Sequence, residues 1–329
     1  MSNILIAVHR AWPFPGGSEY YTMDIAVELK KRGNMVTILA HEHEGDKKGI
    51  RITNDYNVLV NERFDLVLVH GGDVITQNIV HANAAIIKSP ICYMIIKPSE
   101  SQVCLHGMKW DDIIAYSTSM DIEHIRKFNH LDKARRIRHG IVVEETIAKP
   151  GIFKKRYGID GKLIVSAGGF YPHKGMIELA EVFTEANLKD TTLCLFGYAD
   201  GPKPEETHDI KVFQKFDKGT VMEAIADADL YVMNSTEEGF GLVLLEAMMN
   251  KTPWIAREIA GASDMKEYGF TYNNKQGLYI FLDGLFNNVK EELSDKIENL
   301  IEKAYNFAMS NHTIKQTVND IEDIINEIS

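Results

Sequence analysis

Two glutamates with a glycine turn between them could bind a ligand and take part in its chemistry. Glu238 and Glu246 lie eight positions apart, separated by Gly239-Phe240-Gly241 and an apolar run. Helix-forming residues replace turn residues at about Gly241, so the pattern predicts a loop that opens into a helix. With a rise of about 1.5 Å per residue, the two carboxylates would lie roughly 8–12 Å apart. That separation suits a ligand with hydroxyl groups at both ends and phosphate between them, such as a nucleotide sugar.

The elements around the glutamates favour an anion site. A short buried strand is predicted over Ala228–Met233, directly before the loop. A strand, a glycine turn and a helix make anion sites in α/β proteins, because free backbone N–H groups and the positive helix end face the ligand. Gly239 and Gly241 let the backbone approach closely. An acidic helix start before a buried helix explains the same residues, since glutamate at a helix N-terminus is stabilising by itself.

The stretch E-G-F-G-L-V-L-L-E, from Glu238 to Glu246, resembles the E-x7-E signature of a glycosyltransferase family. This is the large retaining GT-B family, family 4-like or group 1, which includes sucrose synthases and mannosyltransferases of cell-envelope assembly. The resemblance implies a donor site in which Glu246 holds ribose hydroxyls and Glu238 holds the transferred sugar. The other members of that site on this stretch are Ser235, Gly239, Phe240, Gly241 and Leu242.

A lysine in the second half of the chain resembles the family's diphosphate-binding residue. His173-Lys174-Gly175 resembles the end of the segment G-R-L-x-x-x-K-G, with Gly168 and Gly169 aligned on its G-R. A lysine near a strand end can neutralise a diphosphate leaving group, although a solvated surface lysine gives the same pattern. The arginine normally paired with this lysine is absent, because Gly169 stands in its place. This departure leaves open weaker diphosphate binding, an unusual donor, or another cation such as Arg257 or His173.

The first half opens with a β-α-β pattern. It comprises a strand over Ile4–Val8, a loop with Gly16-Gly17, a helix over Glu19–Arg32 and a strand over Met35–Ala40. The loop lacks the G-x-G-x-x-G dinucleotide fingerprint. Its P-x-G-G-x-E pattern resembles the family's first loop, whose glycines border the donor pyrophosphate and the acceptor.

A histidine near the reacting sugar commonly ends a first-domain strand in this family. The strand predicted over Phe64–His70 ends in His70, and the next one, over Pro90–Lys97, ends in Lys97. The resemblance makes His70 a candidate catalytic group beside Glu238 and Lys174. A histidine that only makes structural hydrogen bonds fits the same position.

Alternating strands and helices in both halves predict an α/β protein of two doubly wound, Rossmann-like domains that face each other across a cleft, the GT-B fold. A strand predicted over Arg136–Val142 resembles the last strand of the family's first domain, with His139 in place of an asparagine. We therefore expect an N-terminal acceptor-side domain over residues 1–146 and a C-terminal donor domain over residues 147–329. The second domain would include terminal helices over Leu278–Asn287, Val289–Asn311 and Thr313–Ile328.

Composition narrows the classes of partner. The net charge of −11 argues against nucleic acid, and no apolar run approaches the ~18 residues of a membrane span. The first residues are typical of a strand rather than a signal peptide, and three widely spaced cysteines fit a reducing cytoplasm. The basic run Lys133–Arg138 could contact an anionic membrane surface or an acidic polymer, or could be an exposed helix end. The oligomeric state stays open.

Asp227-Ala228-Asp229 is formally the D-x-D metal signature of the other glycosyltransferase architecture. It precedes a strand instead of following one, so we expect no metal site and assign the cation's role to Lys174 and helix dipoles. The prediction is a retaining transferase that moves a hexose-type sugar from a nucleotide-diphosphate sugar, without a bound cofactor, to a glycan, lipid or small-molecule acceptor. A GT-B epimerase or hydrolase, and a non-catalytic nucleotide-sugar binder, are the alternatives.

Overall fold

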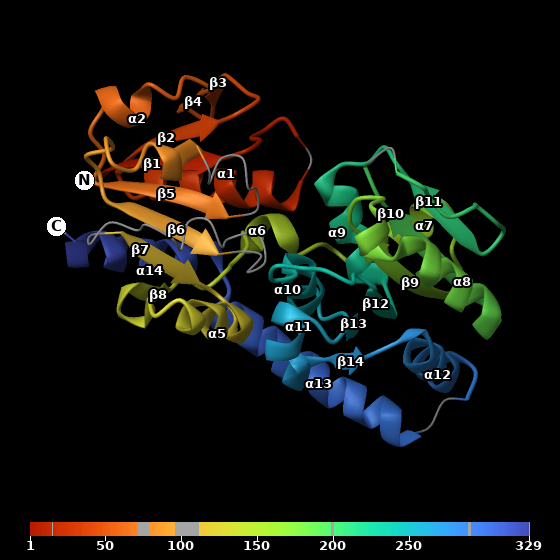
Figure 1. Cartoon of the computed structure of the whole chain (residues 1–329). Coiled ribbons are helices and arrows are strands. Elements are labelled where there is room, and N and C mark those ends of the chain that lie inside the picture. The colour runs from red at the N-terminus through yellow and green to blue at the C-terminus, as the bar shows by residue number, and fades with distance from the viewer. Residues whose placement is uncertain (15, 72–78, 96–111, 199–200, 289–290, 329) are drawn as a thin grey trace. The chain divides into compact units, whose positions relative to one another are not determined.

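The chain folds into two compact units, each built on one mainly parallel sheet (Figure 1). The computed structural model describes residues 1–14, 16–71, 79–95, 112–198, 201–288 and 291–328. Contacts group Met1–Ile141 and His312–Ser329 into unit 1, and Val142–Asn311 into unit 2. Among the described residues, no helix combines the length and hydropathy needed to cross a membrane.

Unit 1 holds an eight-stranded sheet in the order β3-β4-β2-β1-β5-β6-β7-β8, in which every pairing except that of β3 with β4 is parallel. The chain starts at central β1 and winds outward in both directions, as the sequence predicts. The strands are β1 Asn3–Val8, β2 Met35–Ala40, β3 Gly45–Lys47, β4 Ile50–Thr53, β5 Leu66–Gly71, β6 Ile91–Ile95, β7 Ile113–Tyr116 and β8 Ala134–Arg136. The helices include α1 Gly17–Lys31, α2 Val58–Asn61, α5 Ser119–Lys127 and α14 Ile314–Ile328.

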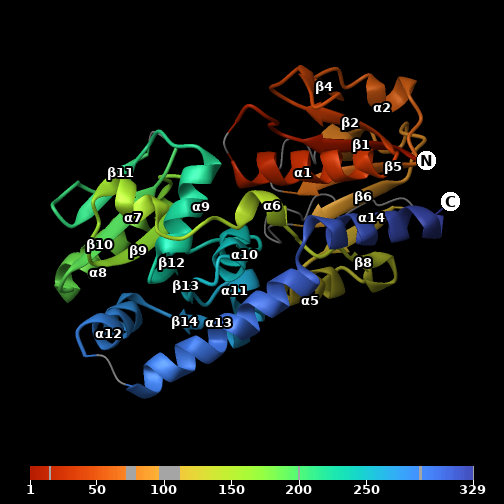
Figure 2. The ribbon, with the colours of Figure 1, turned by 180° about the vertical axis from the view of Figure 1, so that it is seen from behind.

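The last helix of the chain belongs to unit 1, where α14 packs beside α1 (Figure 2). Its apolar side is buried, and its acidic side binds arginines of the same unit, because Arg138 pairs with Asp320 and Arg135 with Glu327. The predicted division, 1–146 and 147–329, differs from this one since it gives α14 to the second domain. The sequence shows that α14 is amphipathic, but its partner surface is set by these long-range contacts.

The segment before the unit boundary also differs from its prediction. A strand over Arg136–Val142 is wrong, because β8 already ends at Arg136. After β8, the backbone forms hydrogen bonds with α14 and pairs with the residue that precedes it, Thr313. The Arg138 N–H donates to Asp320 at 2.8 Å, and Ile141 forms a single parallel bridge with Thr313.

Unit 2 holds a six-stranded parallel sheet in the order β11-β10-β9-β12-β13-β14. Counted along the chain within this unit, the order is 3-2-1-4-5-6, that of a Rossmann fold. The strands are β9 Lys162–Ala167, β10 Thr191–Phe196, β11 Ile210–Phe213, β12 Leu230–Met233, β13 Trp254–Arg257 and β14 Phe270–Tyr272. The helices are α6 Val143–Thr146, α7 Ile152–Tyr157, α8 Met176–Ala186, α9 Lys218–Asp227, α10 Leu242–Met249, α11 Ala260–Asp264, α12 Lys275–Phe286 and α13 Glu291–Asn311.

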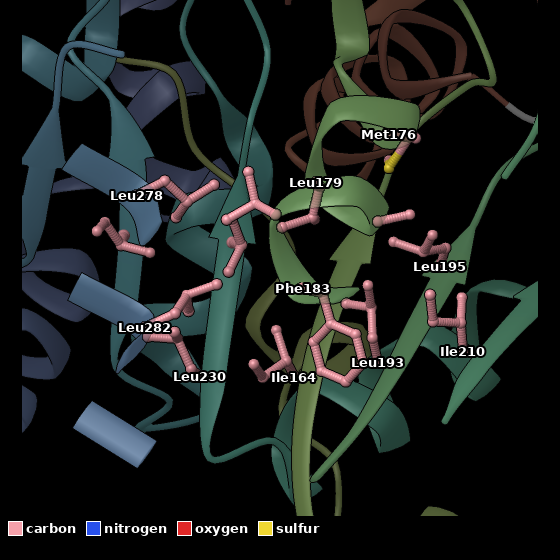
Figure 3. Packing of buried hydrophobic residues seen from close by; sticks show 14 of the residues in the cluster. Ile164, Met176, Leu179, Phe183, Leu193, Leu195, Ile210, Leu230, Leu278 and Leu282 are labelled. Atoms are coloured by element: carbon pink, nitrogen blue, oxygen red, sulfur yellow. The ribbon is translucent and has the colours of Figure 1, made fainter. Parts of the chain in front are cut away.

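One face of this sheet is covered by α8 and α12 (Figure 3). Leu179 of α8 and Leu282 of α12 pack with Ile164 and Leu230 of the central strands, and all four side chains are fully buried. Parallel strands buried on both faces read as continuous apolar runs, which explains why the sequence predicts them well. This core fixes the strand ends that carry the candidate site.

Candidate functional site

The carboxyl ends of β9 and β12 bring the main predicted site residues together. These strands are neighbours, but the chain leaves β9 toward β10 on one side and leaves β12 toward β13 on the other. Ligands of doubly wound sheets bind at such a switch point, where the loops diverge. The loop after β9 carries Lys174, and the loop after β12 carries Ser235 and Glu238.

These three side chains are in contact. Lys174 Nζ forms an ion pair with Glu238 Oε1, and Ser235 Oγ donates to the same oxygen at 2.9 Å. The side chains of Lys174 and Glu238 are 21% and 16% exposed, so water screens their attraction less than at an open surface. The group therefore offers a cation, a carboxylate and a hydroxyl at one point of the sheet edge.

The turn that presents Lys174 is fixed to the end of β12. The backbone N–H of Thr236 donates to His173 O at 2.7 Å, and Asn234 Nδ2 donates to Gly175 O at 2.7 Å. Gly175 has φ +64°, and a Cβ there would lie 2.4 Å from Asn234 O. Only glycine satisfies both the left-handed conformation and this close approach.

The start of α10 supplies backbone donors next to Glu238. Gly241, with φ +88°, is the N-cap of the helix, and as a glycine it has no side chain that could cap the first N–H groups. The loop is packed firmly, because Phe240 is buried and a Cβ on Gly261 would lie 2.0 Å from Phe240 O. The first helical residue is Leu242, so the predicted strand, glycine loop and helix are confirmed as elements.

Glu246 lies inside α10. Glu246 and Glu238 both raise the pKa of a buried tyrosine, Tyr231, which sequence reasoning missed. The Tyr231 hydroxyl accepts from Ala167 N at 3.1 Å and donates to Ala167 O at 3.2 Å. Burial raises the pKa of Tyr231, and the Glu246 and Glu238 carboxylates raise it further. Tyr231 thus remains a neutral hydroxyl that joins β12 to the end of β9.

The glycines aligned on the family's G-R lie against the Lys174 turn. A Cβ on Gly168 would lie 3.6 Å from Lys174 Cδ, so this glycine borders the lysine stem. A Cβ on Gly169 would lie 2.4 Å from the Tyr171 ring. The Tyr171 ring therefore occupies the space into which a side chain at position 169 would begin.

A network of polar side chains lies beside this turn and contains Arg257. From the sequence, Arg257 is only a possible replacement for the arginine that is absent at Gly169. Arg257, the last residue of β13, pairs with Glu178 and donates to Asn234 Oδ1 at 3.1 Å. Tyr272 also donates to Asn234 Oδ1. Sequence reasoning missed Glu178, Asn234 and Tyr272, although an asparagine directly after a buried strand is a usable signal.

The two aspartates of the D-x-D pattern are held by their own chain. Asp229 pairs with Lys154 and Lys162, each at 2.9 Å, and Asp227 accepts the Lys154 N–H at 2.8 Å. Burial opposes ionisation of Asp229, but these lysine hydrogen bonds outweigh it and lower its pKa. Within the described part of the chain, no group of three or more His, Cys, Asp or Glu side chains is arranged to hold a metal.

The predicted site residues of unit 1 lie at the switch point of its own sheet, between β1 and β5. Gly16 precedes α1, Gly17 begins it, and a Cβ on Gly16 would collide with the Glu19 carboxylate. His70 is the next-to-last residue of β5 and is 3% exposed, with its ring 6.0 Å from that of Tyr21. Lys97 lies outside the described residues.

Two further buried histidines, His139 and His312, belong to the same cluster as His70. His139 Nδ1 is hydrogen-bonded to the Tyr21 hydroxyl at 2.7 Å, and His312 Nδ1 to His139 O at 2.6 Å. Burial lowers the pKa of His139 to about 3, with further contributions from His70 and His312. His139 is therefore a neutral core residue near neutral pH, and His70 lies beside it.

Comparisons with solved structures identify the fold. HepE (Alr3699) of Anabaena, in complex with UDP-glucose, is similar with a TM-score of 0.80 and 16% identity over 99% of this chain and 100% of that chain. Sucrose-phosphate synthase of Thermosynechococcus elongatus has a TM-score of 0.81 and 13% identity, over 100% and 99% of the chains. WaaG, a glycosyltransferase involved in lipopolysaccharide biosynthesis, has a TM-score of 0.73 and 16% identity, over 99% of each chain. The predicted GT-B fold is confirmed.

Comparisons of sequence identify the family. N-acetyl-alpha-D-glucosaminyl L-malate synthase of Bacillus anthracis is 25% identical over 187 residues, which are 53% of this chain and 49% of that protein. The match thus spans about half the length of that curated relative. The profile described as glycosyl transferases group 1 matches residues 151–318, which contain Lys174, Glu238 and Glu246. Since this match covers more than half of the residues, the chain belongs to the glycosyl transferases group 1 family.

Proposed function

We propose that this glycosyltransferase moves a hexose-type sugar from a nucleotide-diphosphate sugar to a glycan, lipid or small-molecule acceptor, with retention of anomeric configuration. The observation that carries the proposal is the contact of Lys174 with Glu238 at the switch point between β9 and β12. A diphosphate requires a cation there, and a sugar requires an acceptor for its hydroxyl protons. The site supplies both within one ion pair.

Each polar group has a definite role in this proposal. Lys174 binds the diphosphate and stabilises the charge that it gains as the bond to the sugar breaks. Glu238, oriented by Ser235, and the backbone N–H groups of residues 239–241 bind the transferred sugar. Glu246 binds the ribose hydroxyls, and Gly168 leaves room beside the lysine. The acceptor hydroxyl forms the new bond to the anomeric carbon, and its proton passes to the departing phosphate oxygen.

The resemblance to the family also assigns roles to three residues of unit 1. Gly16 and Gly17 border the diphosphate and the acceptor, and His70 contributes a polar group near the reacting sugar. His70 is buried near Tyr21 and His139, which also fits a structural role for this histidine. His70→Ala distinguishes the two, because a structural role lowers the melting temperature and a catalytic role lowers the turnover of folded protein.

Relatives support the choice of donor class. HepE was solved in complexes with UDP-glucose, with UDP and glucose, and with UDP. The name of the Bacillus anthracis relative points to an amino-sugar donor and a small carboxylic acid as acceptor. We extend to this chain only their common chemistry, a nucleoside diphosphate that carries a hexose-type sugar.

Transfer without a metal ion is part of the proposal. Lys174 and the start of α10, whose N-cap is a glycine, place positive charge where a cation would otherwise neutralise the diphosphate. Of the D-x-D carboxylates, Asp229 is already paired with Lys154 and Lys162, and Asp227 accepts the backbone N–H of Lys154. Unchanged turnover after exhaustive treatment with EDTA is the expected result.

We further propose a cytoplasmic enzyme with a peripheral membrane contact through Lys133–Arg138. Arg135 and Arg138 pair with α14 carboxylates, which reduces the charge that this run can offer to a membrane. Co-sedimentation with anionic liposomes at low and high salt tests the contact. Binding that is absent at low salt rejects it.

A screen of nucleotide sugars by thermal shift, followed by transfer assays with an acceptor panel, tests the activity. A true donor raises the melting temperature because it binds the native state. NMR of the product then gives the anomeric configuration. Donor consumption in the absence of any acceptor would favour an epimerase or hydrolase.

One observation favours a second candidate, a non-catalytic nucleotide-sugar binder. The family's arginine is replaced by Gly169, and the Tyr171 ring fills the adjacent space. A site with one cation fewer could hold a donor without activating it. Donor binding without turnover across the whole acceptor panel would establish that candidate.

A further inference from the structure

Four polar side chains form a network beside the Lys174 turn. Arg257 pairs with Glu178 of α8 and donates to Asn234 Oδ1 at 3.1 Å. Asn234 Nδ2 donates in turn to Glu178 Oε1 at 3.0 Å and to Gly175 O at 2.7 Å. Tyr272 donates to Asn234 Oδ1 from the end of β14. The carboxyl ends of three strands are thereby joined to the backbone of the turn.

Because these polar side chains are largely buried, each one costs free energy unless its hydrogen bonds within the network are kept. Asn234 is 1% exposed, and the Arg257 side chain is 14% exposed. The Arg257 guanidinium also lies 5.4 Å from the centre of the Tyr272 ring. A partly buried cation is tolerated when it is paired, but removing one partner leaves the others with unmet hydrogen bonds. The arginine therefore constrains the groups that it touches.

The direct effect of Arg257 is on the orientation of the Asn234 amide. An arginine is a donor only, so it requires an acceptor and turns Asn234 Oδ1 toward itself and Tyr272. The amide nitrogen must then face Gly175 O. Without the arginine, Asn234 Oδ1 loses one of these two donors and keeps the Tyr272 hydroxyl, which can donate or accept, while Gly175 O and Glu178 Oε1 still accept from the amide nitrogen.

The next link is from Asn234 to Lys174. Asn234 Nδ2 donates to Gly175 O, and the backbone N–H of Thr236 donates to His173 O at 2.7 Å. The two carbonyl groups on either side of Lys174 are thus both bound by the end of β12. The side chain of Lys174 then reaches Glu238 from a backbone that is held on both sides by these bonds.

We propose that Arg257 is a positioning residue which, through Asn234 and Gly175, holds Lys174 in place for the diphosphate. The inference rests on the proposed function, since it assumes that Lys174 binds phosphate. It also accounts for how a turn lacking the family's arginine at Gly169 stays ordered, because Arg257 fixes it from the β13 side. Arg257 itself acts through the turn and needs no contact with the donor.

Binding measurements with a nucleoside diphosphate and its parent nucleoside test this inference. UDP, GDP and ADP are first titrated into the wild-type protein by calorimetry to find the one that binds. Arg257→Met should lower the affinity for that diphosphate about ten-fold and change the affinity for the nucleoside less than about two-fold. Lys174→Met should have the same selective effect. The double variant should be no weaker than Lys174→Met alone, because coupled residues are not additive.

Two further variants protect the test against a general loss of structure. Asn234→Asp keeps the size of the side chain and its bond to Arg257, but removes the donor to Gly175 O, and should lose diphosphate affinity to the same extent. Arg257→Lys should restore part of it. Arg156→Met is the matched control, since Arg156 pairs with Glu223 between α7 and α9, and should leave both affinities unchanged.

Three results would overturn the inference. Arg257→Met could weaken the diphosphate and the nucleoside equally, which indicates a purely structural role. In the double variant, the losses of diphosphate affinity from Arg257→Met and Lys174→Met could multiply, which indicates that the two residues act independently. Asn234→Asp could bind the diphosphate as wild type does. A wild-type protein that binds none of the three diphosphates would instead reject the proposed function, and the inference with it.

Discussion

Lys174 Nζ is bonded to Glu238 Oε1, so the cation assigned to the donor diphosphate is also the partner of the carboxylate assigned to the sugar. The two residues come from loops after different strands, 64 positions apart in the chain. A phosphate that binds Lys174 has to compete with Glu238 for the same ammonium group. Donor binding and the freedom of the Glu238 carboxylate are therefore coupled.

Removal of the Lys174 charge should mainly affect turnover. Lys174→Met is expected to lower kcat by about 10²–10³-fold, the usual effect of deleting one group that stabilises developing charge. Steady-state kinetics with the identified donor measure it. Lys155→Met removes an exposed lysine from the same unit and should leave kcat unchanged; equal losses in both variants would contradict the role of Lys174.

Removal of the Glu238 charge should separate product binding from transfer. Glu238→Gln frees Lys174 from a half-buried ion pair, so the affinity for the nucleoside diphosphate should rise about five-fold, which corresponds to roughly 1 kcal/mol. Transfer should fall, because the sugar loses its carboxylate. Calorimetry and kinetics on one preparation measure both changes.

The neighbouring Glu237 is exposed and provides the matched control. Glu237→Gln makes the same change of charge one residue away and should alter neither quantity. A Glu238→Gln protein that binds the diphosphate more weakly than wild type would show that the carboxylate does not compete for Lys174.

Alanine at Gly175 should damage both stability and binding. Gly175 and Gly158 have nearly equal φ angles, +64° and +63°, but only at Gly175 would a Cβ meet other atoms. Gly158→Ala should cost about 1 kcal/mol of unfolding free energy from backbone strain. Gly175→Ala should cost about 2–4 kcal/mol, since overpacking against Asn234 adds to the strain, and should weaken diphosphate binding. Urea denaturation and calorimetry check the pair, and equal costs would contradict the close approach.

The stability of unit 1 should fall in acid because of His139. Its pKa is about 3 in the folded protein, since burial disfavours the charged ring, against about 6.5 when unfolded. Between these values the unfolded state binds a proton that the folded state does not, so stability present above pH 6.5 is lost as the pH falls toward 3. His139 alone contributes a slope of about 1.4 kcal/mol per pH unit.

His139→Asn should remove that part of the slope. Denaturation curves between pH 4 and 7, followed for wild type and variant, measure it. His208→Asn, at an almost fully exposed histidine, should leave the slope unchanged. An unaltered slope in His139→Asn would contradict the assignment of the acid sensitivity to this residue.

The parts of the fold that depend on local pattern were predictable from the sequence. Apolar runs predicted the central strands. The strand over Met35–Ala40 has its predicted bounds, and the helix predicted over Glu19–Arg32 runs from Gly17 to Lys31. The short β3 and β14 were missed, because three residues carry too little periodicity. The partner of α14 was also missed, since its acidic face and the arginines near Arg138 meet across 182 positions of sequence.

The site divides in the same way. Glu238, Glu246 and Lys174 could be named from motif and spacing, because short segments place them at strand ends. Tyr231 and Asn234 could not, since their roles come from bonds to Ala167 and Gly175 in another loop. The pairing of Lys174 with Glu238 likewise depends on β9 and β12 being neighbours, which the order of elements along the chain does not show directly.

The most direct test of the account is sugar transfer from the identified nucleotide sugar by Glu246→Ala. Glu246 lies in α10, its carboxylate contributes to the raised pKa of Tyr231, and its proposed role is to hold the ribose. The variant should keep the wild-type melting temperature within about 2 °C and raise the donor KM at least about ten-fold, the effect of losing hydrogen bonds to a charged group. Wild-type kinetics in the folded variant would contradict the assignment of a nucleotide-sugar site to this stretch.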